Sequence, residues 1–111
     1  MLRMRDLEEI KTRLREFAEE RDWQKFHTPK NLAVALASEA GELLAEFRWQ
    51  SDDANELSVE ELNRIKSEIA DIAIFLVRLC DVLDVDLAEV ITTKLEQNAN
   101  RPVDGPNLRK P

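Results

Sequence analysis

Two pairs of acidic residues lie inside otherwise apolar stretches of the sequence. Glu39 and Glu42 fall in ALASEAGELLAEF, and Glu68 and Asp71 fall in SEIADIAIFLV. Helical residues three apart share one face, so each pair would point in one direction. Buried carboxylates without a cationic partner are costly, and neither stretch contains Lys or Arg. The four carboxylates therefore predict a site for a divalent cation with oxygen ligands, expected to be Mg²⁺.

Such a site suits polyphosphate chemistry. Four acids remain anionic after one ion binds, so they could hold two or more ions around a polyphosphate. The expected reaction is hydrolysis of a phosphoanhydride, in which metal lowers the pKa of the attacking water and an unsaturated carboxylate accepts its proton. The alternative is two solvated acid pairs, which the apolar flanks disfavour. A ferritin-like di-iron site needs Glu-x-x-His, and the single histidine, His27, lies outside both pairs.

Composition places the chain among small all-α proteins. It has 111 residues with two glycines and no tyrosine, which fits one helical domain. A net charge of −7 argues against a general nucleic-acid or membrane binder, but permits a nucleotide held through metal. The longest apolar run, residues 72–77, is too short to span a bilayer. Cys80 is alone, which fits a reducing compartment, so we expect a soluble, cytoplasmic protein.

Four helices are predicted from apolar periodicity and start signals. Thr28 followed by Pro29 provides a capping hydroxyl and a proline at the first helical position. Ser58 and Asp86 each precede a glutamate by three residues, which is capping-box spacing. The expected helices cover residues 6–20, 29–49, 58–83 and 86–98.

The third helix is too apolar for a small monomer. From Ile69 to Val77 only Asp71 is polar, so this helix should be buried nearly all round. We therefore expect a four-helix bundle-like subunit that oligomerisation completes. Residues 1–100 would form the single helical domain. Residues 101–111 hold three of the four prolines and would form an irregular tail.

Helix geometry brings the acid pairs level. In an antiparallel hairpin of the second and third helices, Glu42 and Glu68 would lie roughly 10 and 14 Å from the turn. Glu39 and Asp71 would lie roughly 15 and 18 Å from it. A shared metal site requires this arrangement.

Longer segments resemble a known family. RDWQKFHTPKNLAVALASEAGELLAEFRWQ and SEIADIAIFLV are similar to the all-α nucleoside triphosphate pyrophosphohydrolases, closest to the dCTP pyrophosphatase branch of the MazG-like group. The resemblance covers roughly residues 15–101 and includes the E-x-x-E and E-x-x-D pairs. It implies that all four acids bind Mg²⁺ and are catalytic. It also implies a homodimer or homotetramer with sites between subunits.

The resemblance also implies substrate-binding residues. Phe75 follows Asp71 by one turn and could stack on a base, although core packing is the alternative for each aromatic residue. A first-helix contact of the branch falls on Leu14 here, so that contact is expected to be absent. The expected substrate-binding residues are Trp23, His27, Asn31, Trp49, Phe75, Lys94 and Asn98.

The sequence thus predicts a Mg²⁺-dependent pyrophosphohydrolase. It would convert a dNTP, with dCTP or a modified dCTP as first choice, to dNMP and pyrophosphate in nucleotide-pool sanitation. Two alternatives stay open. One is a related pyrophosphohydrolase with a dUTP or damaged-purine preference. The other is a non-catalytic helical oligomerisation module, which would show no Mg²⁺ dependence.

Overall fold

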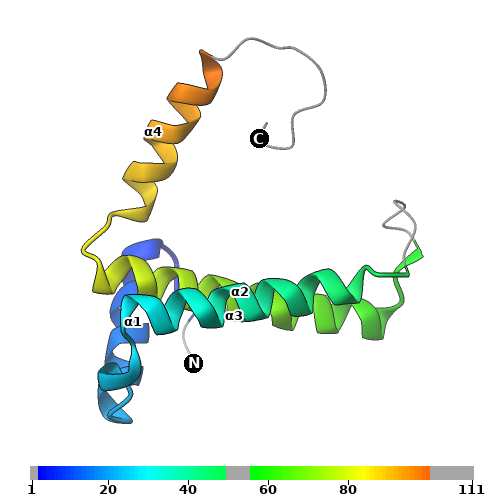
Figure 1. Ribbon diagram of the computed structural model, residues 1–111, viewed down its shortest axis with the longest axis horizontal. Coiled ribbons are helices and arrows are strands. Elements are labelled where there is room, and N and C mark those ends of the chain that lie inside the picture. The colour runs from blue at the N-terminus through cyan, green and yellow to red at the C-terminus, as the bar shows by residue number, and fades with distance from the viewer. Residues whose placement is uncertain (1–2, 50–55, 101–111) are drawn as a thin grey trace.

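The computed structural model describes residues 3–49 and 56–100, which are helical with short connections (Figure 1). No strand occurs within these residues, which confirms the predicted all-α class. The elements in chain order are α1 (Leu7–Glu20), the 3₁₀ helix η1 (Gln24–Phe26), α2 (Pro29–Glu46), α3 (Val59–Val82) and α4 (Leu87–Ala99). The predicted tail, residues 101–111, and most of the connection after Trp49 lie outside the described residues.

Side-chain caps begin the helices where the sequence predicted them. Thr28 Oγ1 accepts a hydrogen bond from the Asn31 amide, and Pro29 is the first helical residue of α2. Ser58 and Glu61 form both hydrogen bonds of a capping box at the start of α3. At the start of α4, the Asp86 side chain accepts a hydrogen bond from the Glu89 backbone amide, without the second bond of a capping box. These caps satisfy backbone N–H groups that the first turn leaves without partners.

Backbone hydrogen bonds explain where three of the helices end. The helix expected to reach Trp49 ends at Glu46, because the amides of Phe47 and Arg48 bond to carbonyls three residues back and tighten the turn. α1 and α3 both end in Schellman motifs, with Asp22 and Asp84 at φ 55° and 56°. Aspartate tolerates this left-handed conformation better than bulky residues do, so the chain can turn sharply there.

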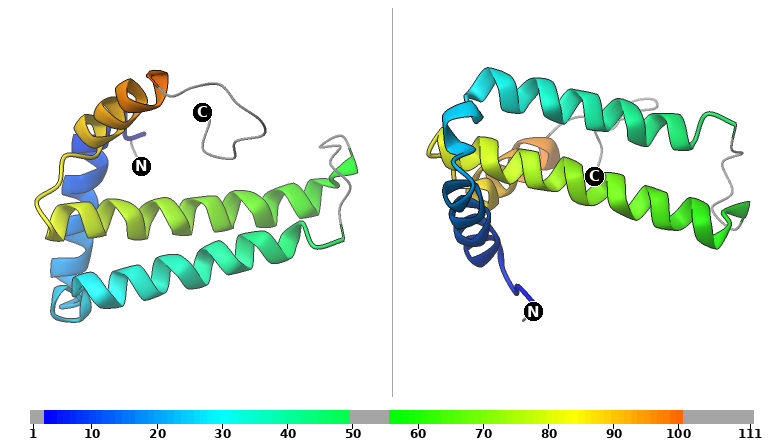
Figure 2. Two further views of the ribbon diagram at one scale, coloured as in Figure 1. Left: turned by 45° about the horizontal axis from the view of Figure 1, so that its top comes forward. Right: turned by 90° about the horizontal axis from the view of Figure 1, so that it is seen from below.

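The helices form an antiparallel hairpin with α1 across one end. α2 and α3 lie side by side along most of their length, and α1 crosses near the start of α2 and the end of α3 (Figure 2). Among the described residues, the buried apolar side chains are Ala18 of α1, Leu32 of α2, and Ile65 and Val77 of α3. The hairpin that the sequence predicted is therefore present.

Apolar surface remains exposed within one chain. α4 points away from the hairpin, and its Val90, Ile91 and Leu95 are 46–47% exposed (Figure 1). On α3, Ile69 is 53% exposed and Ile74 40%. The expectation that α3 is buried nearly all round is thus not met by a single chain, and its oligomeric completion stays a prediction. Within residues 3–49 and 56–100, no helix is long and apolar enough to cross a membrane.

Candidate metal centre and adjacent cleft

Three of the four predicted acids meet between the two long helices. Carboxylate oxygens of Glu39, Glu68 and Asp71 all lie within 4.8 Å of one another, and the three residues are half-buried. Glu39 comes from α2, whereas Glu68 and Asp71 come from α3. The hairpin therefore makes one cluster from two distant sequence pairs, as the helical rise predicted.

The cluster holds uncompensated negative charge. A shared hydrogen bond with Glu39, burial, and the charges of Glu39, Glu42 and Asp71 raise the pKa of Glu68 to about 7. Glu68 Oε2 is enclosed and has no hydrogen-bond partner among the described residues. An all-oxygen ligand set with an unpartnered oxygen fits a divalent cation, which would take the place of the shared proton.

Glu42 lies at the edge of this cluster. It is exposed and outside the group of three close oxygens, although its charge still acts on Glu68. One turn further along α2, Glu46 is paired with Arg64, whose Nε lies 3.1 Å from Oε2. The row of acids on α2 therefore ends in a neutralised pair, and the unpaired charge is concentrated around Glu39.

A cleft of about 490 Å³ lies against α1 and the second half of α3. Of the predicted substrate-binding residues, Trp23, His27 and Phe75 line it, and Leu14 is also in its wall. Phe75 follows Asp71 by four residues, or roughly 6 Å along the helix axis. The acid cluster and the cleft are therefore neighbours on α3, which suits a ligand with a phosphate end and an apolar ring.

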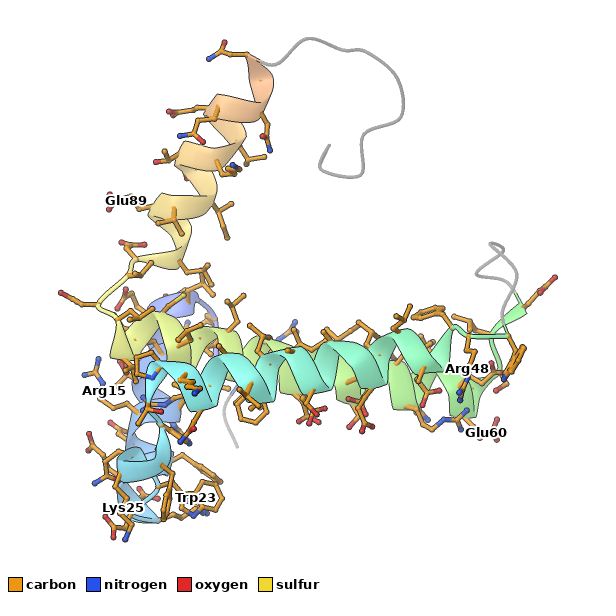
Figure 3. The ribbon with its side chains drawn as sticks, in the orientation of Figure 1. Arg15, Trp23, Lys25, Arg48, Glu60 and Glu89 are labelled. Carbon is orange, nitrogen blue, oxygen red and sulfur yellow. The ribbon has the colours of Figure 1, made fainter. Side chains whose placement is uncertain are left out.

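The aromatic wall of the cleft is built from α1 and the following connection. Phe17 and Trp23 meet edge to face with ring centroids 5.7 Å apart, and the Arg21 guanidinium lies 3.4 Å from the Phe17 ring centroid. Figure 3 shows Trp23 at the end of α1 that lies away from α4. Trp23 is 46% exposed, so its ring retains free surface for a ligand.

Sequence reasoning missed a buried charge network behind this cleft. Arg78 is 5% exposed; its Nη1 donates to Asp81 Oδ2 at 3.0 Å and its Nε to His27 Nδ1 at 3.2 Å. Arg15 also binds Asp81 with two nitrogens, at 2.6 and 2.9 Å. One signal was available, because Arg78 interrupts the apolar run IFLVRLC and has an acid three residues later. Arg15 gave no such signal.

These partners shift two pKa values. The Arg15 hydrogen bond holds the pKa of the Asp81 carboxyl below its usual value. Burial, and then the charge of Arg78, lower the pKa of His27. His27 is therefore neutral near pH 7.

The remaining predicted residues do not line the cleft. The Asn31 side chain donates to the Phe26 carbonyl at 3.0 Å and so holds the connection before α2. Trp49 is 88% exposed and lies beside Arg48. Figure 3 shows Arg48 at the opposite end of the hairpin from Trp23. Lys94 and Asn98 lie on the projecting helix α4. A single chain thus assembles the acids and one aromatic wall, and leaves these residues apart.

Comparison with known proteins identifies the family. The model of the MazG-like family matches residues 34–109. The chain belongs to the MazG-like family. This match includes both acid pairs and confirms the resemblance seen in the sequence.

Individual relatives agree with this assignment. Proteins named dCTP pyrophosphatase 1 from Bos taurus and Homo sapiens are 40% and 39% identical over 98 residues, which is 86% of this chain. The chain spans 58% of the length of these relatives. A crystal structure of a pyrophosphatase from Archaeoglobus fulgidus has a TM-score of 0.77 and 37% identity, covering 94% of this chain and 98% of that one.

Proposed function

We propose that this protein is a Mg²⁺-dependent nucleoside triphosphate pyrophosphohydrolase that converts a dNTP, with dCTP or a modified dCTP preferred, to dNMP and pyrophosphate. The observation that carries the proposal is the three-carboxylate cluster of Glu39, Glu68 and Asp71 in a MazG-like chain. The names of the curated relatives support the choice of dCTP.

In this proposal the acid cluster binds the metal, and the cleft one turn further along α3 binds the base. The acids, with Glu42 as the fourth, would hold Mg²⁺, which when bound neutralises developing charge and lowers the pKa of water. Phe75 and Trp23 would hold the base and exclude water from it. A water oxygen would bond to the α-phosphorus, the bond to the bridging oxygen would break, and pyrophosphate would leave. A carboxylate of the cluster would accept the proton from that water.

Assembly and location belong to the same proposal. The half-exposed apolar residues of α4 and α3 support a homodimer or homotetramer. Such an assembly would bring further residues to the site, including those that one chain leaves apart: Asn31, Trp49, Lys94 and Asn98. A cytoplasmic location would suit a role in nucleotide-pool sanitation.

Product analysis in isotopic water tests the proposal. The purified chain would be incubated with dCTP, dUTP, dTTP, dATP or dGTP and Mg²⁺ in H₂¹⁸O, and the products resolved by chromatography and mass spectrometry. We expect dCMP and pyrophosphate to form fastest, with ¹⁸O in the monophosphate and no reaction in chelator. Label in the pyrophosphate would contradict attack at the α-phosphorus. Absence of product from these five nucleotides and from a modified dCTP would contradict the function.

A further inference from the structure

Arg78 is a buried cation in the cleft wall that the proposed reaction does not use. It follows Phe75 by three residues and Asp71 by seven, so all three lie on one face of α3. The rise from Asp71 to Arg78 is roughly 10 Å. Moving along this face from the acid cluster, a ligand meets first an aromatic ring and then a guanidinium. Arg78 thus lies beyond the phosphate end of the site, where a base would reach.

The guanidinium is held in one orientation. Asp81 accepts from Nη1, His27 accepts from Nε, and Arg15 donates to both carboxylate oxygens of Asp81. Nη2 has no hydrogen-bond partner among the described residues. An arginine this deeply buried is costly unless its donors are used, so its fixed geometry leaves the two N–H groups of Nη2 for a ligand.

The same contact fixes the proton on His27. Arginine has no acceptor, so the Nδ1 atom that faces Arg78 must carry the lone pair. Neutral His27 then carries its proton on Nε2. His27 lines the cleft, and its remaining polar atom is therefore a donor.

The side chains of the cleft wall include donors and no strong acceptor. Its nitrogen-bearing side chains are Arg13, Trp23, His27 and Arg78, and none of its lining side chains is a carboxylate, amide or hydroxyl. A bound ring should therefore turn acceptor atoms toward this wall. Cytosine carries two adjacent acceptors, N3 and O2, whereas uracil and thymine carry an N–H at position 3 that would oppose a donor.

We propose that Arg78, together with His27, determines base specificity by donating hydrogen bonds to the N3 and O2 edge of cytosine. Asp81 and Arg15 are positioning residues that aim the guanidinium. This inference rests on the proposed function, since it concerns the base of the same nucleotide. It predicts that discrimination between cytosine and uracil depends on one residue outside the acid cluster.

Binding measurements separate this inference from turnover. The full chain with Mg²⁺ would be titrated calorimetrically with α,β-methylene analogues of dCTP, dUTP and dGTP, whose bridging carbon resists hydrolysis. A fourth ligand is the dCTP analogue with N3 replaced by CH. The variants are Arg78→Met, Arg78→Lys and Arg15→Met, with Lys66→Met, an exposed cation on the same helix, as the matched control.

The expected result is a loss of affinity that depends on the base of the nucleotide. Arg78→Met should weaken the dCTP analogue roughly 10- to 100-fold, as for a hydrogen bond from a charged donor, and bring it close to the dUTP analogue. Replacing N3 by CH should lower the affinity of wild type by a similar factor. It should hardly change the affinity of Arg78→Met, which is the coupling expected of a direct contact. Arg78→Lys should recover part of the affinity. Lys66→Met should bind as wild type does.

Other results would overturn it. Equal weakening of all four ligands in Arg78→Met, or an equal effect of Arg15→Met, would reduce Arg78 to structural support. If Arg78→Met does not fold, wild-type binding decides, because equal affinity for the N3 and CH ligands excludes the contact. A dGTP preference lost in Arg78→Met would overturn the cytosine assignment. Cytosine-selective binding without hydrolysis would support the role of Arg78 and contradict the proposed function. Hydrolysis with an unchanged ratio of dCTP to dUTP affinity in Arg78→Met would support the proposed function and contradict the role of Arg78.

Discussion

Glu68 and Asp81 are acids on α3 whose pKa values are shifted in opposite directions. Glu68 lies among other carboxylates, and the hydrogen bond and charge of Glu39 raise its pKa to about 7. Asp81 lies between two arginines, and Arg15 lowers its pKa. One charge is compensated by the fold and the other is not. The difference indicates that the chain's own arginines compensate the charge of Asp81, whereas the acid cluster around Glu68 requires a cation from outside.

The strongest test of this difference is removal of a cluster acid. Asp71→Asn should reduce turnover of dCTP by more than about 100-fold, because even residues that only support metal ligands contribute about 10- to 100-fold. The fold should survive, since the side chain keeps its size. Steady-state rates and circular dichroism would be compared with Glu60→Gln, an exposed acid in the first turn of α3. Activity near wild type would mean that the cluster is not the reactive centre.

Glu42 tests whether the fourth acid belongs to the cluster. Glu42→Gln should lower turnover by about tenfold or more and raise the Mg²⁺ concentration needed for half-maximal rate, because a ligand would be lost. A magnesium titration of the rate measures both quantities. Unfolding of this variant would instead assign Glu42 a structural role. An unchanged magnesium requirement would confine the metal ligands to the three close carboxylates.

Glu68 and Asp81 should make the stability of the fold depend on pH in opposite directions. The folded-state pKa of Glu68 is raised, so its contribution is greatest below about 4.5 and is lost as pH rises through about 7. In chelator, wild type should therefore lose stability relative to Glu68→Gln across this interval. Asp81 has a lowered pKa, so its contribution is present above 3.8 and is lost at lower pH. Thermal melts of wild type, Glu68→Gln and Asp81→Asn from acid to neutral pH would show the two opposite trends.

The smallest expected effect concerns the outer arginine of the network. The side chain of Arg15 is 47% exposed, so solvent already screens its charge. When Arg15 is removed, Arg78 still compensates the charge of Asp81. Arg15→Met should lower Tm by a few degrees and leave the acid cluster's turnover number close to wild type. A differential scanning measurement at neutral pH would check this. A collapse of the fold would show that Asp81 depends mainly on Arg15.

The sequence predicted features that depend on local patterns. Capping residues, apolar periodicity and helical rise placed the hairpin and brought three acids level, because each depends on neighbours within a few turns. The network behind the cleft was missed because its contacts join distant segments. Arg15 and Asp81 are 66 residues apart, and Arg78 and His27 are 51 apart. No spacing rule within one helix reveals such pairs.

The substrate-binding residues that the family resemblance implies lie in separate parts of the chain. Trp23, His27 and Phe75 reach one cleft because α1 and α3 pack against each other. Trp49 and Lys94 occupy positions that similarity assigned to the nucleotide, yet one lies at the far end of the hairpin and the other on α4. A residue's position in a family motif does not say which subunit's site it serves. Their roles stay predictions.

The different sequence separations also bear on how the chain folds. Contacts within the hairpin, such as Arg64 with Glu46, span 18 residues, whereas those of the Arg78 network span 51 and 66. Closing a short loop costs less entropy than closing a long one, so the hairpin should form early and α1 should dock later. A partly folded chain, with the hairpin formed and α1 not yet docked, would therefore bind a metal ion before it could discriminate between bases.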